Sequence, residues 1–351
     1  MTSVVTVFFP LDRALQLGEQ GWTPGTVAGC PLGALRLGVE IPSYARAAEV
    51  FRELTHLPLS KSTLQRMTTQ YGQQVAATLA AEATAMVSVP CQEETVVWRT
   101  TPEPDSRMMN VSSDGVMIHL RGEGYKEVKT VAISAVVPRP DAQTGELTPH
   151  LTQHSYRAGV WDAPTFANHL WAEAERRGVP KAQYVVSVND GAPWIWAIVF
   201  MCFARCVQIL DWYHATQRLW TIASAYYGAD HAATTQWVET QKALLAKGKL
   251  RDIWRNLRLL YPRGQPLPTP VHQAILYLFH NRQRLRYHEF RRLGCPIGSG
   301  VIESACKLVV QARMKQAGMQ WSRSGASAML ALRSVLLSDR WQLLTLAVNS
   351  V

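Results

Sequence analysis

The order of strand-like and helix-like segments between residues 108 and 213 constrains the fold more than any other feature of the sequence. Strands joined by short turns pair antiparallel, whereas strands joined by a helix pair in parallel through right-handed crossovers. The strand-like segments are Val111–Leu120, Glu127–Val137, Leu151–Arg157, Tyr184–Val188 and Cys206–Leu210, and helical segments Pro164–Gly178 and Ala192–Ala204 separate the last three. The sequence therefore predicts an α/β fold with a mixed five-stranded sheet in the order β-β-β-α-β-α-β-α.

The segments on either side of this region are helical in pattern. No strand pattern occurs from His214 to Phe290, and two late helices are expected at Ser299–Gly318 and Ser324–Ser338. We therefore expect five parts: an N-terminal leader that could be truncated (1–42), a helical domain (43–100), the first part of a core (108–213), an all-α basic insertion (214–295) and the C-terminal helices of the core (296–345).

Length and composition exclude several protein classes. A chain of 351 residues is long enough for two or three compact units, and 47% hydrophobic with 18% charged residues is typical of a globular protein. No apolar run is long enough to predict a membrane span, and no secretion signal is recognisable at the N-terminus. The six cysteines form no CxxC pair, which favours reduced thiols and a cytoplasmic location.

The N-terminal helical domain has the pattern of a helix-turn-helix. Apolar residues recur at helical spacing over Ser43–Thr55, and Pro58 ends that helix. The following SKSTLQRMTTQYG begins with Ser60 or Ser62 as a possible cap. A DNA-reading helix pair and an ordinary αα-hairpin both fit this pattern. On the first interpretation the exposed DNA-contacting residues are Lys61, Gln65 and Arg66.

Basic residues are concentrated in one segment of the chain. The formal net charge is +10, and residues 247–292 contain eleven Lys or Arg but only Asp252 and Glu289 as acids. Such a concentration favours binding of a polyanion, most simply nucleic acid. A solvated basic surface is the alternative. Within this segment Arg282, Arg284 and Arg286 are candidate DNA contacts.

Three acidic residues occupy unusual positions. Asp114 falls inside an apolar strand, Asp190 follows the fourth strand, and Glu303 lies in the first turn of a late helix after Gly298 and Gly300. Each has an ordinary interpretation, because Asp114 could sit in a turn, Asp190 could cap a helix, and an acid is expected near a helix N-terminus. If the three converge, their oxygens suit two Mg²⁺ or Mn²⁺ ions, which activate a nucleophile and stabilise the leaving oxygen of a phosphodiester.

Four ordered blocks carry a resemblance to a known family. They are SSDGVMIHLRGEGYKEVK, VNDGAPWIW, QILDWYHA and GCPIGSGVIESACKLVVQARMKQAGMQWS. In this order they resemble bacterial insertion-sequence transposases of the ISKra group, which are related to Mutator-like transposases and have a ribonuclease-H-like catalytic core. The resemblance runs from about Phe8 to Trp341. One departure is that no CxxC segment precedes the FFPLD stretch at residue 8, where family members often carry one.

The resemblance implies roles for individual residues. Asp114, Asp190 and Glu303 would be the catalytic, metal-binding triad. Asp211 and His214 match a motif that follows the second catalytic Asp, and would orient the site or DNA. Capping of the following helix by Asp211 is an equally good interpretation. Because 112 residues separate Asp190 from Glu303, the helical stretch resembles the all-α insertion of related transposases. Lys307, Arg313 and Lys315 are further expected DNA contacts.

The sequence leaves three functions to compare. The first is a DDE transposase that cleaves insertion-sequence ends and joins them to target DNA, as a homo-oligomer on DNA in the bacterial cytoplasm, associated with the nucleoid and not with a membrane. The second is a nuclease of the same fold that cuts without joining. The third is a non-catalytic DNA-binding regulator built on residues 43–72 and the basic segment. Labelled element ends with Mg²⁺ would separate them.

Overall fold

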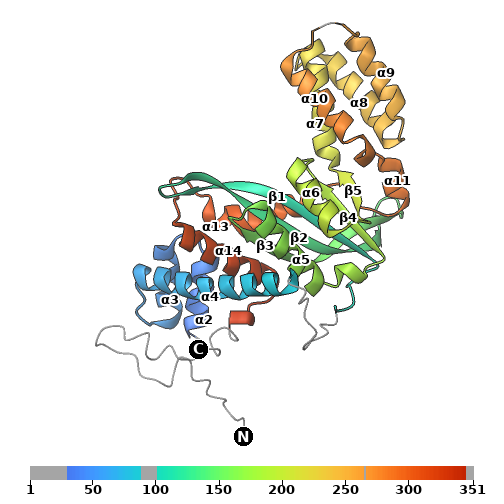
Figure 1. Ribbon diagram of the computed structural model, residues 1–351. Helices are drawn as coiled ribbons and strands as arrows, with labels where there is room; N and C mark the ends of the chain where they lie inside the picture. The colour runs from blue at the N-terminus through green and yellow to red at the C-terminus, as the bar shows by residue number, and fades with distance from the viewer. Residues whose placement is uncertain (1–29, 88–100, 265, 345–351) are drawn as a thin grey trace.

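A mixed five-stranded sheet forms the centre of the molecule in this computed structural model, which describes residues 30–87, 101–264 and 266–344 (Figure 1). The strand order is β3-β2-β1-β4-β5. β1, β2 and β3 pair antiparallel, whereas β4 and β5 run parallel to β1. The strands are β1 Met108–Leu120, β2 Gly124–Pro140, β3 Leu147–Gly159, β4 Tyr184–Asn189 and β5 Val207–Leu210. The predicted α/β class and mixed sheet are confirmed, and the first three strands are longer than expected.

The two faces of the sheet carry different helices. Period-two alternation along β1 sends Met109 and Val111 to the face covered by α5 (Ala163–Arg176) and α6 (Pro193–Cys202). Val116 and Ile118 have the opposite parity and pack against α4 (Lys61–Val87) and α14 (Arg323–Leu337). Asp114 has the parity of Val116, so its side chain belongs to the α4–α14 face.

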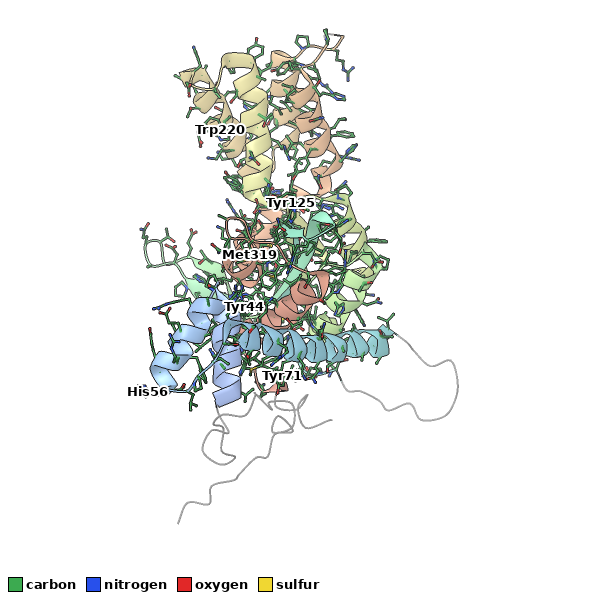
Figure 2. All side chains as sticks on the ribbon, turned by 90° about the vertical axis from the view of Figure 1, so that its left-hand side faces the viewer. Tyr44, His56, Tyr71, Tyr125, Trp220 and Met319 are labelled. Atoms are coloured by element: carbon green, nitrogen blue, oxygen red, sulfur yellow. The ribbon has the colours of Figure 1, made fainter. Side chains whose placement is uncertain are left out.

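The N-terminal helices form a layer beneath this face (Figure 1). Ser43 caps α3 (Tyr44–Thr55), and the hydroxyl of Ser60 accepts from the Thr63 amide at the start of α4. Of the two expected caps, Ser60 is therefore the one used. Tyr44 and Tyr71 lie in this layer (Figure 2). Within the expected leader, 1–42, residues 1–29 lie outside the described residues, and Cys30–Glu40 forms helix α2.

Two buried arginines hold α2 in place. Arg313 Nε donates to the carbonyl of Gly38, and Arg333 Nη1 donates to the carbonyl of Val39, at the C-terminal end of α2. These carbonyls have no partner within the helix, so the guanidinium groups satisfy them. Arg313 also stacks on Tyr44 and is only 1% exposed. The prediction that Arg313 contacts DNA is therefore wrong, because its charge is used inside the protein.

The late helix predicted over Ser299–Gly318 is interrupted. It consists of α12 (Gly300–Ala305), a π-helical segment (Cys306–Gln311) and α13 (Ala312–Met314), where it ends. Arg333 from α14 donates to the carbonyl of Val309 and contacts that of Leu308. A π segment shifts carbonyls out of the normal ladder, and the buried guanidinium satisfies them.

A separate helical unit projects from the end of the sheet where β5 lies (Figure 1). Its core is continuous with the sheet through Val188, Ile209 and Leu210. Within the described part of 212–292 every regular element is helical, as predicted. The elements are α7 Trp212–Tyr227, α8 Ala232–Ala246, α9 Leu250–Leu260, α10 Thr269–His280, a 3-10 turn at Arg282–Arg284 and α11 Tyr287–Arg292. None of the helices in the ranges described above is long and apolar enough to cross a membrane.

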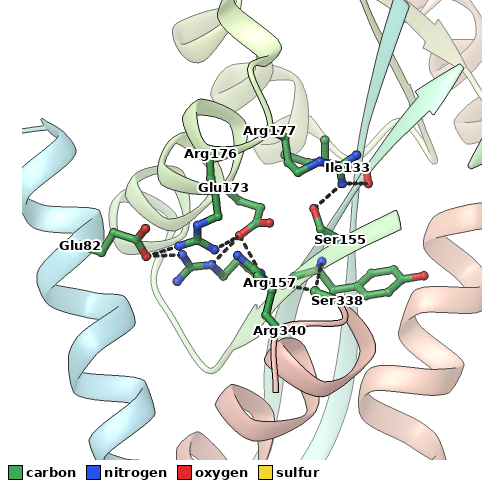
Figure 3. Close-up of polar contacts among 10 residues, drawn as sticks. Glu82, Ile133, Ser155, Arg157, Glu173, Arg176, Arg177, Ser338 and Arg340 are labelled. Carbon is green, nitrogen blue, oxygen red and sulfur yellow. Dashed lines mark hydrogen bonds and ion pairs between the residues drawn. The ribbon is translucent and has the colours of Figure 1, made fainter. Parts of the chain in front are cut away.

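A buried ion network joins the lower helices to the sheet (Figure 3). Arg157 of β3 donates through Nε to Glu173 of α5 (2.9 Å) and through Nη2 to Glu82 of α4 (2.8 Å). Arg176 and Arg340 contact the same Glu173 oxygen. The two acids share three guanidinium groups, so the network connects α4, β3, α5 and the segment after α14 through ion pairs.

Candidate active site

The strands that carry Asp114 and Asp190 separate just before these residues. Backbone pairing of β1 with β4 covers only Met108 to Asn110 on the β1 side. Beyond it, side chains connect the strands: Ser187 Oγ donates to the Val111 carbonyl (2.6 Å), and the Ser113 amide donates to Asn189 Oδ1 (2.7 Å). If the pairing register of Asn110 with Val186 is continued along both strands, Asp114 lies opposite Asp190. The site is therefore an opening between two strands held at a fixed spacing by buried polar side chains.

Asp114 lies in an unfavourable place for a charge. Its Oδ1 accepts from the amide of Gly115 (2.7 Å), and its Oδ2 lies 3.5 Å from Cys306 Sγ. Burial is the main reason that the pKa of Asp114 is raised, and the negative charge of Asp190 raises it further, whereas His214 lowers it. Asp114 and Asp190 are therefore close enough to repel each other, and a cation between them would relieve that repulsion.

Glu303 lies on a helix that approaches Asp114 from the same face of the sheet. The hydroxyl of Ser299 donates to Glu303 Oε1 (3.1 Å), and the Glu303 side chain is exposed. One turn later on this helix, Cys306 contacts Asp114, and the charge of Glu303 contributes to a raised pKa of the Cys306 thiol. α12 also packs on β1 and β2. The helix that carries Glu303 therefore contacts Asp114 through Cys306, and the Glu303 side chain itself is exposed.

Asp211 is fully engaged by the backbone. Its Oδ1 accepts from the amide of His214 and caps α7, and its Oδ2 accepts from the amide of Ser299 (2.6 Å) at the start of the Glu303 helix. The capping interpretation is therefore confirmed. The second bond adds a positioning role, because it fixes the helix that carries Glu303 against the end of β5.

The three acids do not form a closed metal cage as they stand. In the ranges that the structure describes, no three His, Cys, Asp or Glu side chains are arranged to hold an ion together. Asp114 and Asp190 are level in register and affect each other electrostatically, and Glu303 lies on the helix that contacts Asp114 through Cys306. Oxygen ligands of this kind suit Mg²⁺ or Mn²⁺, which retain several water ligands.

A tyrosine from the helical unit closes one side of the site. The Tyr277 hydroxyl of α10 donates to the backbone carbonyl of Asp190. Gly191 makes this contact possible, because it has φ of +91° and an added Cβ would lie 2.7 Å from that hydroxyl. The helical unit is therefore attached directly to the backbone of Asp190.

The residues expected to touch DNA lie in three places. Lys61, Gln65 and Arg66 are exposed on α4, where Gln65 and Arg66 line a shallow depression with Ser62, Thr69 and Gln73. Lys307 and Lys315 are exposed beside the Glu303 helix. Arg282 and Arg286 are exposed in the helical unit. Arg284 between them is half-buried, with Nε donating to Gln208 and the guanidinium stacked on Trp196.

The sequence patterns did not predict several residues of the site. Cys306 follows Glu303 at helical spacing, a signal that was present but has an ordinary core interpretation. Asn189, which bridges β1 and β4, immediately precedes Asp190. Tyr277 carries no local signal, since its partner lies 87 residues away. Comparisons with protein-family models and with curated proteins find no significant match to this chain.

Proposed function

We propose that this chain is a DDE-type transposase with a ribonuclease-H-like core, in which residues 214–295 are an insertion. The observation that supports this most is the placement of Asp114 and Asp190 level with each other across the separated β1 and β4 strands, with the Glu303 helix on the same face. None of the ion pairs within the described ranges includes any of these three acids. Their charge is therefore available for a cation.

The chemistry follows from what these residues can hold. Two divalent cations, when bound, would supply a nucleophile at neutral pH and stabilise the leaving oxygen of a phosphodiester. Asp114 and Asp190 would hold the cations between the strands, and Glu303 would close the site from the helix. Asp211 and Ser299 would keep that helix in place. The basic helical unit would bind the backbone of the transposon end.

The test uses labelled element ends taken from the sequence that flanks this gene. The wild-type chain with Mg²⁺ should cleave the end and join its 3′-hydroxyl to target DNA. Asp190→Asn should abolish both reactions while leaving DNA binding nearly intact, because an amide does not supply the charge that the cation needs. The matched control is Asp162→Asn, since Asp162, like Asp190, accepts from a backbone amide near a helix start but lies exposed at the start of α5.

Three outcomes distinguish the functions. Joined products support a transposase, and cleavage without joining supports a nuclease of the same fold. Equal cleavage by Asp190→Asn and wild type would contradict the assignment of the site. Binding without cleavage under all conditions would favour the non-catalytic DNA-binding regulator.

A further inference from the structure

A cavity of about 600 Å³ opens beside Asp190, between the sheet and the helical unit. Its wall includes Asp190, Trp196 of α6, Arg218 of α7, Tyr277 of α10, Asn281 and Arg284. A volume of this size is typical of sites that enclose a small ligand. The cavity shares Asp190 with the candidate active site but extends away from Asp114 toward the helices.

Two arginines in this wall lack acidic partners. Arg218 lies over the ring of Tyr277 at 4.6 Å, and Arg284 lies over the ring of Trp196 at 4.3 Å. Neither takes part in an ion pair within the described ranges. Burial lowers the pKa of the Arg284 guanidinium, which means that its charge is partly deprived of water. Two such cations facing one cavity favour an anion there.

Two polar atoms in the same wall have no partner. Trp196 is 6% exposed, and among the described side chains its Nε1 is buried without an acceptor. The Nε of Arg218 is likewise buried without an acceptor. Buried donors are normally satisfied, so these two are exceptions on residues that line the cavity. The two guanidinium groups favour a negatively charged ligand in the cavity.

We infer that this cavity receives one nucleotide of the DNA strand next to the bond that is cut, with its phosphate on Arg218 and Arg284 and its base against the Trp196 end. Planar guanidinium and aromatic groups provide stacking surfaces for any base, and the donors suit phosphate and base oxygens. This inference rests on the proposed function for the identity of the ligand as DNA. Its place beside Asp190 would fix the strand relative to the reacting phosphate.

The first experiment measures binding in EDTA, where no cleavage occurs. Fluorescence anisotropy compares a labelled ten-nucleotide thymidine strand with an abasic strand of the same length and charge. The wild-type chain should prefer the base-bearing strand by about tenfold, because one stacked base contributes at that level. If the cavity bound phosphate alone, the two strands should bind equally and excess inorganic phosphate should weaken both to the same extent. If the cavity binds a nucleotide, the base-bearing strand should be preferred with or without added phosphate.

The variants are Arg218→Gln and Arg284→Gln, with Arg291→Gln as the matched control. Arg291 is also stacked on a tryptophan, Trp212, but does not line the cavity. Each cavity variant should lose about tenfold in affinity for the thymidine strand and most of the base preference, because a charge-assisted contact is lost. The control should lose only about twofold and keep the preference, since it removes one exposed charge.

A second measurement on the wild-type chain does not depend on folding of variants. A strand carrying 5-iodouracil is irradiated, and the cross-linked peptides are identified. Cross-links to the peptides of Trp196 or Tyr277 are expected. Equal affinity for the two strands, or cross-links confined to α3 and α4, would overturn the inference while leaving the cleavage proposal intact. No binding of any strand would overturn both.

Discussion

The molecule contains two groups of acidic residues that differ in their partners. In the paired cluster, Glu82 and Glu173 are bound by Arg157, Arg176 and Arg340. In the open cluster, Asp114, Asp190 and Glu303 form no ion pair with any residue that the structure describes. The paired cluster contains the more deeply buried acid, since Glu173 is 0% exposed.

This difference separates structural charge from functional charge. A buried acid with arginine partners connects elements, and its charge is already balanced by cations. Burial first, and then the charge of nearby Asp190, raise the pKa of Asp114, an arrangement that favours binding of a cation. The comparison therefore predicts opposite consequences when members of the two clusters are replaced.

The largest effect is expected for Asp114→Asn in the open cluster. Strand cleavage should fall by about 10⁴-fold, as for loss of a catalytic carboxylate. Stability should rise, because a raised carboxyl pKa means that folding loses stability as pH increases through the ordinary Asp value toward the raised one. Thermal unfolding at pH 7 without metal measures this. A lower melting temperature for Asp114→Asn than for wild type would contradict the proposed difference between the two clusters.

In the paired cluster, Arg157→Met should destabilise the fold without acting on the chemistry directly. Removing Arg157 leaves Glu173 buried with fewer partners, which costs about 3–5 kcal/mol in such networks. Urea unfolding measures the loss. Arg176→Met is the control, because Arg176 is 23% exposed and its loss leaves Arg157 in place. Equal stability of wild type and Arg157→Met would refute the structural role.

A histidine beside the paired cluster makes the stability of the fold depend on pH. Burial first, and then the charge of Arg157, lower the pKa of His169 to about 4. The unfolded chain takes up the proton near pH 6.5, so stability is full above that value and is lost as pH falls toward about 4. His169→Phe, which retains the stack on Trp161, should reduce this loss by about 2 kcal/mol in denaturant titrations. If stability depended on pH in the same way in wild type and His169→Phe, the lowered pKa of His169 would be contradicted.

The smallest effect concerns the exposed arginines of the helical unit. Arg282 and Arg286 are exposed, whereas Arg284 is held by Gln208 and Trp196. Replacing the two exposed residues by Ala should reduce the slope of log affinity against log salt for duplex DNA by about 2. Adding Arg284→Ala should change the duplex slope little further. An unchanged slope in the double variant would shift duplex binding to α3 and α4.

Local patterns predicted the sheet but not the contacts between distant segments. Alternation and short apolar runs bounded by turn residues placed all five strands, because a strand buried on both faces is apolar throughout. The positions of Asp114 and Asp190 followed from the same pattern. Arg313 was misjudged because its partners, Gly38 and Tyr44, lie far away in the chain, and its sequence neighbours resemble an exposed basic helix. α2 and the π segment were missed for the same reason, since arginines of other helices stabilise both.

Within the site, too, the sequence predicted local contacts and missed contacts between distant segments. Capping by Asp211 was one of two interpretations that the sequence left open, and it rests on a local signal, the spacing to His214. Its bond to the Ser299 amide joins segments 88 residues apart, and no local pattern encodes it. The contact between Cys306 and Asp114 spans 192 residues and depends on how α12 packs on the sheet.

The central claim is that the open cluster binds divalent cations and the paired cluster does not. The most direct test is titration of the full-length chain with Mn²⁺, with free ion followed by electron paramagnetic resonance, in the presence and absence of element-end DNA. Wild type should bind Mn²⁺, more tightly with DNA, and the Asp114→Asn, Asp190→Asn double variant should not. A Glu82→Gln variant should bind as wild type does. Equal Mn²⁺ binding by wild type and the double variant would contradict the account.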